Sequence, residues 1–424
     1  MNDADWCRTC RRLHETGSRE VDVNPLMLRD RLAVLDQLMR KAPWNILSNF
    51  DLLDEADLVT GCTSRAKIIE TGILGWKKMP VSPRQTILAL AIEIRAHDEL
   101  LARLDSRYNR IPPDPSAEWR TSDGSAFVIP SRRGRDLGSK DGNGLSYGRR
   151  GTLMYRVVPA SLDGMPVRPI TLAALESRPG SGIVSLGASL FPGMTLRTKQ
   201  SADGFIATGV QHPDIAAALD RQVASLAGAA ALVWPELTLD NSAIDHLGPA
   251  LAKLAFERED VPDIVVAGSW HRARGDAVRN VAPILDGTGE ISDEYSKVVI
   301  FQSDELGPEG IAAGAEIIVI ACDRFLATVA ICKDYCGLGT NSPWHKLDVD
   351  LLLVPSMGGA TTMEGHLTRA NQDRIEHGSC AFVVQQGVKR RPEDPEGFIL
   401  HASSKPPKNA ADVASNEEWT RHEI

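Results

Sequence analysis

The chain has 424 residues, a formal net charge of −9 at pH 7 and a hydrophobic fraction of 43%. This length is enough for two or three domains with at least one large core, and the apolar content is ordinary for a water-soluble globular protein. The acidic balance gives no reason to expect nucleic acid or an anionic membrane as a partner of the whole protein. No apolar run approaches the roughly 18 residues of a membrane span, so we expect no membrane insertion.

The beginning of the chain carries no recognisable targeting signal. Residues 1–6 have neither a basic start nor an apolar core, which predicts no signal peptide. The seven cysteines form no small-domain framework, which favours reduced thiols in a cytoplasm. Cys7 and Cys10, which are followed by His14, could share a metal, but a structural zinc site needs four ligands and no second Cys-x-x-Cys exists. We therefore expect a loosely packed start, and nothing in the sequence requires a metal or an organic cofactor.

Residues 1–110 are predicted to form a small all-α module. Apolar residues fall on one helical face in its first half: Leu28, Leu32, Leu35 and Met39. A second, longer apolar pattern begins just after Pro83, a common position for a helix start. The module could bind a partner or oligomerise, or it could simply cover the next domain, and its pattern favours neither. Residues 111–150, rich in proline, glycine and arginine, are typical of a linker or long loop.

After the linker the pattern changes to alternating buried strands and helices. Asp214 is suited to cap a helix, and the turn at Asp286-Gly287 is a hairpin signal between residues 281–285 and 297–301. The strand candidates share short apolar, β-branched runs: residues 182–190, 229–234, 264–270, 316–320, 326–332 and 350–354. This alternation predicts a layered α/β sandwich rather than an all-β barrel.

Three of these strands carry or end in a reactive residue. Glu236 follows Trp234-Pro235, Lys297 enters an apolar run, and Cys332 closes the run Ala327-Thr328-Val329-Ala330-Ile331 before a turn. A cysteine there could be an ordinary buried residue. A lysine and a carboxylate, however, are costly to bury singly and become reasonable if they neutralise one another around a thiol.

These residues and their order resemble the nitrilase, or carbon-nitrogen hydrolase, superfamily. Trp-Pro-Glu236, Tyr-Ser-Lys297 and Ile-Cys332-Lys-Asp are similar to its Glu-Lys-Cys triad, and the resemblance extends over residues 182–387. It implies an α-β-β-α sandwich over residues 151–390, which in the family is often paired with a second subunit. A homodimer or higher oligomer is therefore expected. Residues 391–424 would form a C-terminal tail that is disordered or reaches across a subunit interface, with a last strand at 398–400.

The resemblance also implies roles for individual residues. Glu236 would be the general base, Cys332 the nucleophile that forms a thioester, and Lys297, with the backbone N–H of Lys333, the oxyanion donor. Glu305 is the candidate for the family's second glutamate, in competition with Asp304 and Glu309. The segment 333–337 departs from the sequence that many members show after the cysteine, which weakens inference about the substrate. Its Cys336 would line the pocket, with redox behaviour as the lesser alternative.

Several activities are compatible with this reading. The first is hydrolysis of a small-molecule amide, with a carbamoyl or nitrile substrate as a variant. The second is N-acyl transfer from the same thioester. The third is a non-catalytic scaffold, against which the intact set of Glu236, Lys297 and Cys332 argues. A Cys-His hydrolase ranks lower, because no histidine sits at a comparable strand end; the candidates are His271, His345, His366 and His377.

Overall fold

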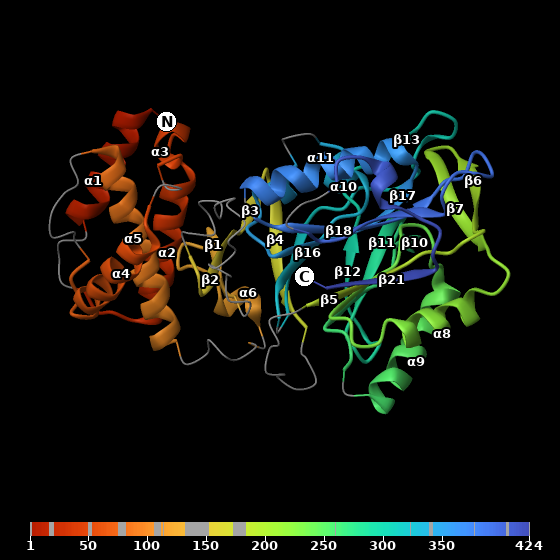
Figure 1. Ribbon diagram of the computed structural model, residues 1–424, viewed down its shortest axis with the longest axis horizontal. Coiled ribbons are helices and arrows are strands. Elements are labelled where there is room, and N and C mark those ends of the chain that lie inside the picture. The colour runs from red at the N-terminus through yellow and green to blue at the C-terminus, as the bar shows by residue number, and fades with distance from the viewer. Residues whose placement is uncertain are drawn as a thin grey trace. The chain divides into compact units, whose positions relative to one another are not determined.

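The computed structural model describes residues 2–16, 21–49, 53–74, 82–105, 112, 114–131, 152–172, 184–258, 260–322, 324–338, 342–376, 378–403 and 407–423. The chain divides into two compact units (Figure 1). The first unit comprises Met1–Ser161 with Ile375–Gly378, and the second comprises Leu162–Arg374 with Ser379–Ile424. In the described ranges, no helix combines the length and apolarity needed to cross a membrane.

The first unit is built mainly from helices, as the sequence predicts. Its helices are α1 (Asp3–Thr16), α2 (Pro25–Arg40), α3 (Trp44–Leu47), α4 (Glu55–Glu70), α5 (Pro83–Leu104) and α6 (Pro115–Glu118). The Asn24 and Ser82 side chains cap α2 and α5 by accepting hydrogen bonds from backbone N–H groups of the first turn. Each helix begins with a proline, at a position where a backbone N–H would have no partner within the helix. The leucines that define the apolar face of α2 are buried in this unit's core. The prediction of a helical module is confirmed.

Two features of the first unit differ from expectation. The loosely packed start is wrong: Trp6 and Cys10 of α1 are fully buried, and the Trp6 Nε1–H donates to the Leu38 carbonyl at 2.9 Å. The spacing of these two residues, four apart, places them on one helical face. In addition, strand β1 (Ala126–Pro130) pairs antiparallel with β2 (Tyr155–Pro159) and lies within the segment whose composition is typical of a linker. Its buried apolar run is too short to dominate the polar composition around it.

The second unit contains two large sheets. One has the order β10-β11-β9-β8-β5-β21 with β12 on the side of β11, and the other has the order β20-β19-β18-β17-β16-β15-β4-β3. The strands of the first are β5 (Ser185–Ser189), β8 (Ala231–Val233), β9 (Ile264–Val266), β10 (Trp270–Arg274), β11 (Ala277–Leu285), β12 (Ile291–Ser296) and β21 (Trp419–Glu423). Those of the second are β3 (Ser161–Leu162), β4 (Met165–Thr171), β15 (Ile317–Ala321), β16 (Leu326–Val329), β17 (Leu351–Gly358), β18 (Cys380–Gly387), β19 (Gly397–Leu400) and β20 (Ala414–Ser415).

Helices cover the outer face of each sheet in the second unit (Figure 1). Helices α8 (Ile215–Ser225) and α9 (Asn241–Glu257) share a buried core with β8 and β9, to which Leu219, Leu247 and Val265 belong. Helices α10 (Lys333–Cys336) and α11 (Ala360–Glu376) lie on the side of the second sheet. The architecture is the α-β-β-α sandwich that the sequence predicts. As expected, the Asp214 side chain caps α8 by accepting the Ala217 N–H at 3.0 Å.

The strand candidates predicted from apolar runs all coincide with strands of the two sheets, but other parts of the second unit differ from expectation, and β4 was not predicted. The hairpin around Asp286 exists, but its second strand is β12, so that Lys297 follows the strand instead of beginning one. The hairpin of β6 (Thr195–Ser201) and β7 (Gly204–Gln211) was not predicted, because β6 is polar and mostly exposed and the apolar run of β7 is only three residues long, Phe205-Ile206-Ala207. The described part of the tail is ordered: β20 pairs with β19, and β21 pairs antiparallel with β5.

Candidate active site

The cysteine at the end of β16 sits on a strained turn. Cys332 has φ 47° and ψ −100°, a conformation that L-residues rarely adopt and that typically costs about 1–3 kcal/mol. Its N–H donates to the Pro355 carbonyl at 2.9 Å, and α10 begins at the next residue. The side chain is therefore held where the strand stops and the chain turns. The residue is only 2% exposed.

Asp334 fixes this turn against the segment that carries Lys297. Its Oδ1 accepts the N–H groups of Val298 and Val299 at 3.0 and 2.6 Å, and its Oδ2 accepts the Ile331 N–H at 3.1 Å and the Tyr295 hydroxyl at 2.7 Å. Burial raises the pKa of Asp334 to about 7, and these hydrogen bonds, all donated to it, oppose that rise. One carboxylate thus couples the ends of β12 and β16.

Lys297 lies between two carboxylates. Its Nζ is 2.7 Å from Glu236 Oε1 and 2.7 Å from Glu309 Oε2, and all three side chains are almost completely buried. Burial alone would lower the pKa of Lys297, but the two carboxylates raise it above its usual value, so the ammonium keeps its charge. Burial would likewise raise the pKa of Glu309, yet Lys297 and His271 hold it below its usual range.

Asn280 and His271 complete the cluster. The Asn280 Nδ2 donates to Glu236 Oε1 at 3.0 Å and to Glu309 Oε1 at 2.8 Å. His271 Nδ1 accepts the Ala207 N–H at 2.8 Å, so the proton of the neutral ring lies on Nε2, which donates to Glu309 Oε1 at 2.8 Å. Asn280 thus joins the two carboxylates, and His271 and Asn280 share the Oε1 of Glu309.

The two carboxylates differ in how fully their oxygens are used. An ionised carboxylate offers about four acceptor positions. Glu309 fills all four, with His271 and Asn280 on Oε1 and Lys297 and the Phe301 N–H on Oε2. Glu236 fills three within the described residues, with Lys297 and Asn280 on Oε1 and the Met357 N–H on Oε2. One acceptor position on Glu236 Oε2 is therefore open.

The end of β17 passes between Glu236 and Cys332. Three consecutive residues take part: the Pro355 carbonyl accepts the Cys332 N–H, the Ser356 carbonyl accepts the Glu236 N–H at 3.3 Å, and the Met357 N–H donates to Glu236 Oε2 at 3.1 Å. The Met357 carbonyl in turn lies 3.8 Å from the Cys332 Sγ. One strand end therefore sets the spacing of the carboxylate and the thiol.

The charge balance around the thiol disfavours a resting thiolate. Burial raises the pKa of Cys332 well above its usual value, Glu236 raises it further, and Lys297 acts in the opposite direction. A protonated thiol is therefore the resting form, and a base must remove its proton before it can attack.

The structure brings together three of the four residues predicted from the sequence and separates the fourth. Glu236, Lys297 and Cys332 lie at the ends of β8, β12 and β16, as just described. Glu305 does not belong to the site: its side chain is 75% exposed and lies 3.5 Å from the Arg390 guanidinium. The reason is a tight hairpin, since β13 (Gln302–Ser303) and β14 (Gly307–Pro308) place residues 304–306 at the tip and return the chain so that Glu309 meets Lys297.

Sequence reasoning also missed residues that support the site. Asn280 was not singled out in the sequence and His271 was considered only for a Cys-His hydrolase, whereas both contact the carboxylates. Among the histidines in the described ranges, none hydrogen-bonds to the Cys332 thiol; His377 lies outside the described residues. No disulfide links any of the seven cysteines, and burial raises the pKa of Cys336. Within the described ranges, no cluster of three or more histidine, cysteine or acidic residues could hold a metal.

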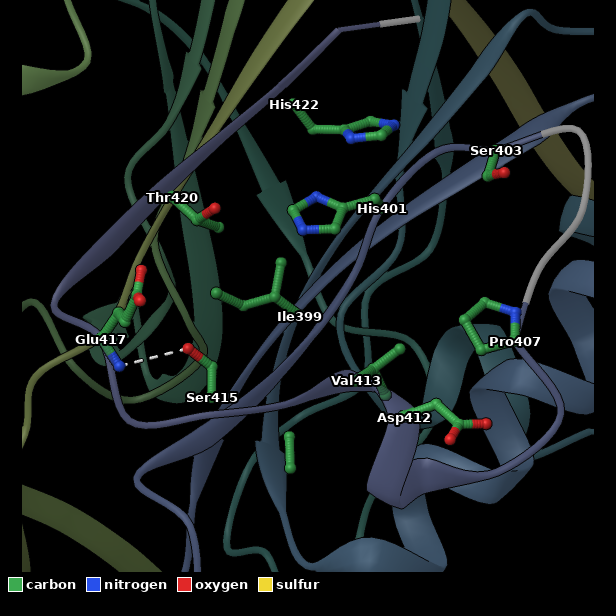
Figure 2. A pocket seen from close by; sticks show the side chains of 11 residues that line it. Ile399, His401, Ser403, Pro407, Asp412, Val413, Ser415, Glu417, Thr420 and His422 are labelled. Carbon is green, nitrogen blue, oxygen red and sulfur yellow. Dashed lines mark hydrogen bonds between the residues drawn. The ribbon is translucent and has the colours of Figure 1, made fainter.

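A separate cavity of about 300 Å³ lies in the C-terminal part of the second unit (Figure 2). The rings of His401 and His422 stack there with centroids 4.5 Å apart, and burial together with the neighbouring His422 lowers the pKa of His401 to about 4. Asp412 and Ser415 line the same cavity. None of the residues around the Cys332 thiol contributes to its wall.

Comparisons with known proteins find similarity at the level of structure only. No protein-family model matches the chain, and no curated protein matches it either. Solved structures that match include the Nit3 protein of Saccharomyces cerevisiae, a member of branch 10 of the nitrilase superfamily, with 15% identity over 57% of this chain and 89% of that one at a TM-score of 0.40.

Two further matches are similar in extent. A CN-hydrolase superfamily protein from Xanthomonas campestris shares 16% identity over 57% of this chain and 90% of its own, at a TM-score of 0.38. An amidase from Nesterenkonia sp. shares 16% identity over 53% of this chain and 84% of its own, at a TM-score of 0.35. These solved structures belong to the nitrilase or carbon-nitrogen hydrolase superfamily, the family that the sequence motifs resemble.

Proposed function

We propose that the second unit is a thiol hydrolase of the carbon-nitrogen hydrolase type, which cleaves a non-peptide C–N bond through a thioester on Cys332. The observation that carries this proposal is the unequal use of the two carboxylates beside Lys297. Glu309 has no free acceptor position, whereas Glu236, counting the part of the chain that the structure describes, has one on Oε2, the oxygen that contacts Met357, as the Cys332 thiol also does. Glu236 is thus the carboxylate able to take the thiol proton.

The first half of the reaction follows from this arrangement. Glu236 removes the Cys332 proton, and the thiolate attacks the carbonyl carbon of the substrate. The C–N bond then breaks, the amine leaves with the proton returned by Glu236, and the acyl group stays on sulfur as a thioester. General acid-base catalysis of this kind typically contributes about 10²- to 10⁴-fold.

Two donors are available for the oxyanion of the tetrahedral intermediate. The Lys297 ammonium has three N–H groups, of which two serve Glu236 and Glu309, leaving one for the substrate oxygen. The backbone N–H of Lys333 has no hydrogen-bond acceptor in the described part of the chain. Loss of one such donor typically costs about 2.7–4 kcal/mol of transition-state stabilisation.

The second half uses the same groups. Water replaces the departed amine, Glu236 takes its proton, and the resulting attack releases the acid and restores the thiol. Glu309 contacts no reacting atom in this scheme; it holds Lys297 charged and in place, and it takes the place of the second glutamate, for which Glu305 was the first candidate and Asp304 and Glu309 were the alternatives.

Intact-protein mass spectrometry after exposure to a panel of small amides, carbamoyl compounds and nitriles tests this proposal, with Cys332→Ala as the control. The expected result is an acyl adduct on the wild-type chain that Cys332→Ala lacks, together with released ammonia or amine. Adding a primary amine as acceptor distinguishes acyl transfer, which would yield a new amide, from hydrolysis, which would not. If neither an adduct nor a released amine is found with any compound, the hydrolase proposal fails and the scaffold alternative gains.

A further inference from the structure

A buried polar pair lies next to the Cys332 thiol on the second sheet. Ser356 belongs to β17 and His366 to α11, and both are completely buried. The Ser356 Oγ lies 3.0 Å from His366 Nε2, and the residues on both sides of Ser356 contact Cys332: the Pro355 carbonyl accepts its N–H at 2.9 Å, and the Met357 carbonyl lies 3.8 Å from its Sγ. No step of the reaction described above uses either side chain.

The contacts of Gln385 decide where the Ser356 proton points while the thiol is neutral. The Gln385 Nε2 donates to the carbonyls of Gly358 and Gly359, each at 3.0 Å, so its Oε1 is turned toward Ser356. Ser356 donates its O–H to this Oε1 at 3.4 Å, a long hydrogen bond. The serine oxygen then accepts from His366.

The His366 ring is held in a single orientation. It stacks on Tyr335 with ring centroids 5.8 Å apart and an interplanar angle of 16°. Burial lowers the pKa of His366 to about 3, so the ring is neutral and carries one proton. Its Nδ1 is buried and meets no hydrogen-bond partner among the described residues, and the proton consequently belongs on Nε2, where Ser356 can accept it.

We propose that Ser356 and His366 are positioning residues for the thiolate: the Ser356 hydroxyl turns from Gln385 to the Cys332 sulfur when the thiol is deprotonated, while His366 Nε2–H holds the serine oxygen. This inference rests on the proposed role of Cys332 as nucleophile. The thiol proton goes to Glu236, and Ser356 and His366 keep their own protons, so no charge moves through the pair. The same contact serves the thiolate again when it leaves the thioester.

Other groups also act on the thiol and must be separated from this contact. Glu236 and Cys336 raise the pKa of Cys332, and Lys297 lowers it. A hydrogen bond to a charged acceptor is worth enough to shift a pKa by about one to two units. Removing the Ser356 hydroxyl leaves Glu236, Lys297 and Cys336 in place, so the change in the pKa of Cys332 measures the contribution of the hydroxyl alone.

The pH profile of iodoacetamide alkylation of the full-length protein tests the proposal without requiring turnover. Trypsin cleaves after Lys333, so Cys332 and Cys336 fall on different peptides and their alkylation can be followed separately by mass spectrometry. The variants are Ser356→Ala, His366→Leu and His366→Gln, whose amide can still donate to the serine. Thr328→Val, which removes another fully buried hydroxyl, is the matched control. Circular dichroism and thermal unfolding check that each variant is folded.

We expect Ser356→Ala to raise the midpoint of Cys332 alkylation by about one to two pH units, and so to slow alkylation about 10- to 100-fold below the midpoint. His366→Leu should raise the midpoint by a smaller amount, and His366→Gln should keep it near the wild-type value. Thr328→Val should leave the midpoint unchanged. A midpoint unchanged in Ser356→Ala would overturn the proposal. Equal shifts in both His366 variants, or no shift in either, would remove His366 from it. If no amide is turned over, the hydrolase proposal fails while the alkylation profile still decides this one.

Discussion

The correction from Glu305 to Glu309 yields a prediction that stability measurements can decide. Glu309→Gln removes a charge that pairs with the buried Lys297 ammonium, and breaking a buried pair from one side typically costs about 3–5 kcal/mol. The glutamine adds a second penalty. Donors fill all four acceptor positions of Glu309, two at each oxygen. Whichever oxygen the NH₂ group of the glutamine replaces, it therefore faces two donors.

Two matched variants provide the scale. Glu236→Gln also removes a charge that pairs with Lys297, which costs about 3–5 kcal/mol, but its NH₂ can take the Oε2 position, where among the described residues it meets only the Met357 N–H. Its second penalty is therefore smaller than that of Glu309→Gln. Glu305→Gln changes an exposed side chain and should stay within about 0.5 kcal/mol of wild type. The expected order of destabilisation is Glu309→Gln, then Glu236→Gln, then Glu305→Gln.

Urea unfolding followed by circular dichroism measures these differences, provided that the m-values agree among the variants. In an assay of the proposed hydrolase activity, folded Glu305→Gln should match the wild type, because its side chain is exposed and away from Lys297. A Glu309→Gln protein as stable as wild type, or a Glu305→Gln protein destabilised by several kcal/mol, would refute the reasoning about which acid holds Lys297.

Three further predictions concern other parts of the chain. The pKa of Glu309 lies below its value in the unfolded chain. The stability that Glu309 contributes is therefore present above about pH 4.5 and is lost as the pH falls. The difference in the free energy of unfolding between wild type and Glu309→Gln, measured in urea, should shrink on acidification. Asp334→Asn should lower the free energy of unfolding by about 3 kcal/mol or more, because the NH₂ group of the asparagine must face backbone N–H donors at either position. Loss of the contact to the Tyr295 hydroxyl should also change the near-ultraviolet circular dichroism spectrum. Trp6→Ala should destabilise the first unit by about 3–5 kcal/mol, seen as an earlier thermal transition, whereas exposed Trp44→Ala should not.

Much of this architecture can be predicted from the sequence, for physical reasons that differ by element. The helices beginning at Pro25 and Pro83 carry both a capping residue and a periodic apolar face, and these local signals survive in the fold. Strands β8 and β9 are continuous apolar runs, and β16 is apolar except for Thr328, because each strand is buried on both faces. Strand β21, with its polar composition, is defined by its partner β5 in the sheet and leaves no such signal.

The same distinction holds for the site. Glu236, Lys297 and Cys332 could be found because each is a polar residue at the end of an apolar run. The second acid could not be chosen by composition, since three acids lie within six residues and the choice depends on the hairpin of β13 and β14. Glu309, which is followed by Gly310-Ile311, is the acid nearest an apolar segment, the one hint that the sequence offers. Ser356 and His366 meet only through the packing of α11 on β17.

The pairing of β21 with β5 gives the end of the described chain a protective role. Strand β5 is buried in the interior of its sheet only because residues 419–423 complete the hydrogen bonding along its free side. Deleting these residues would expose a five-residue edge of unpaired N–H and C=O groups flanked by apolar residues, the kind of surface on which strands from other molecules add. A shortened protein would therefore be prone to associate through this edge even with the groups around Cys332 intact, and loss of activity after truncation would report aggregation instead of damaged chemistry.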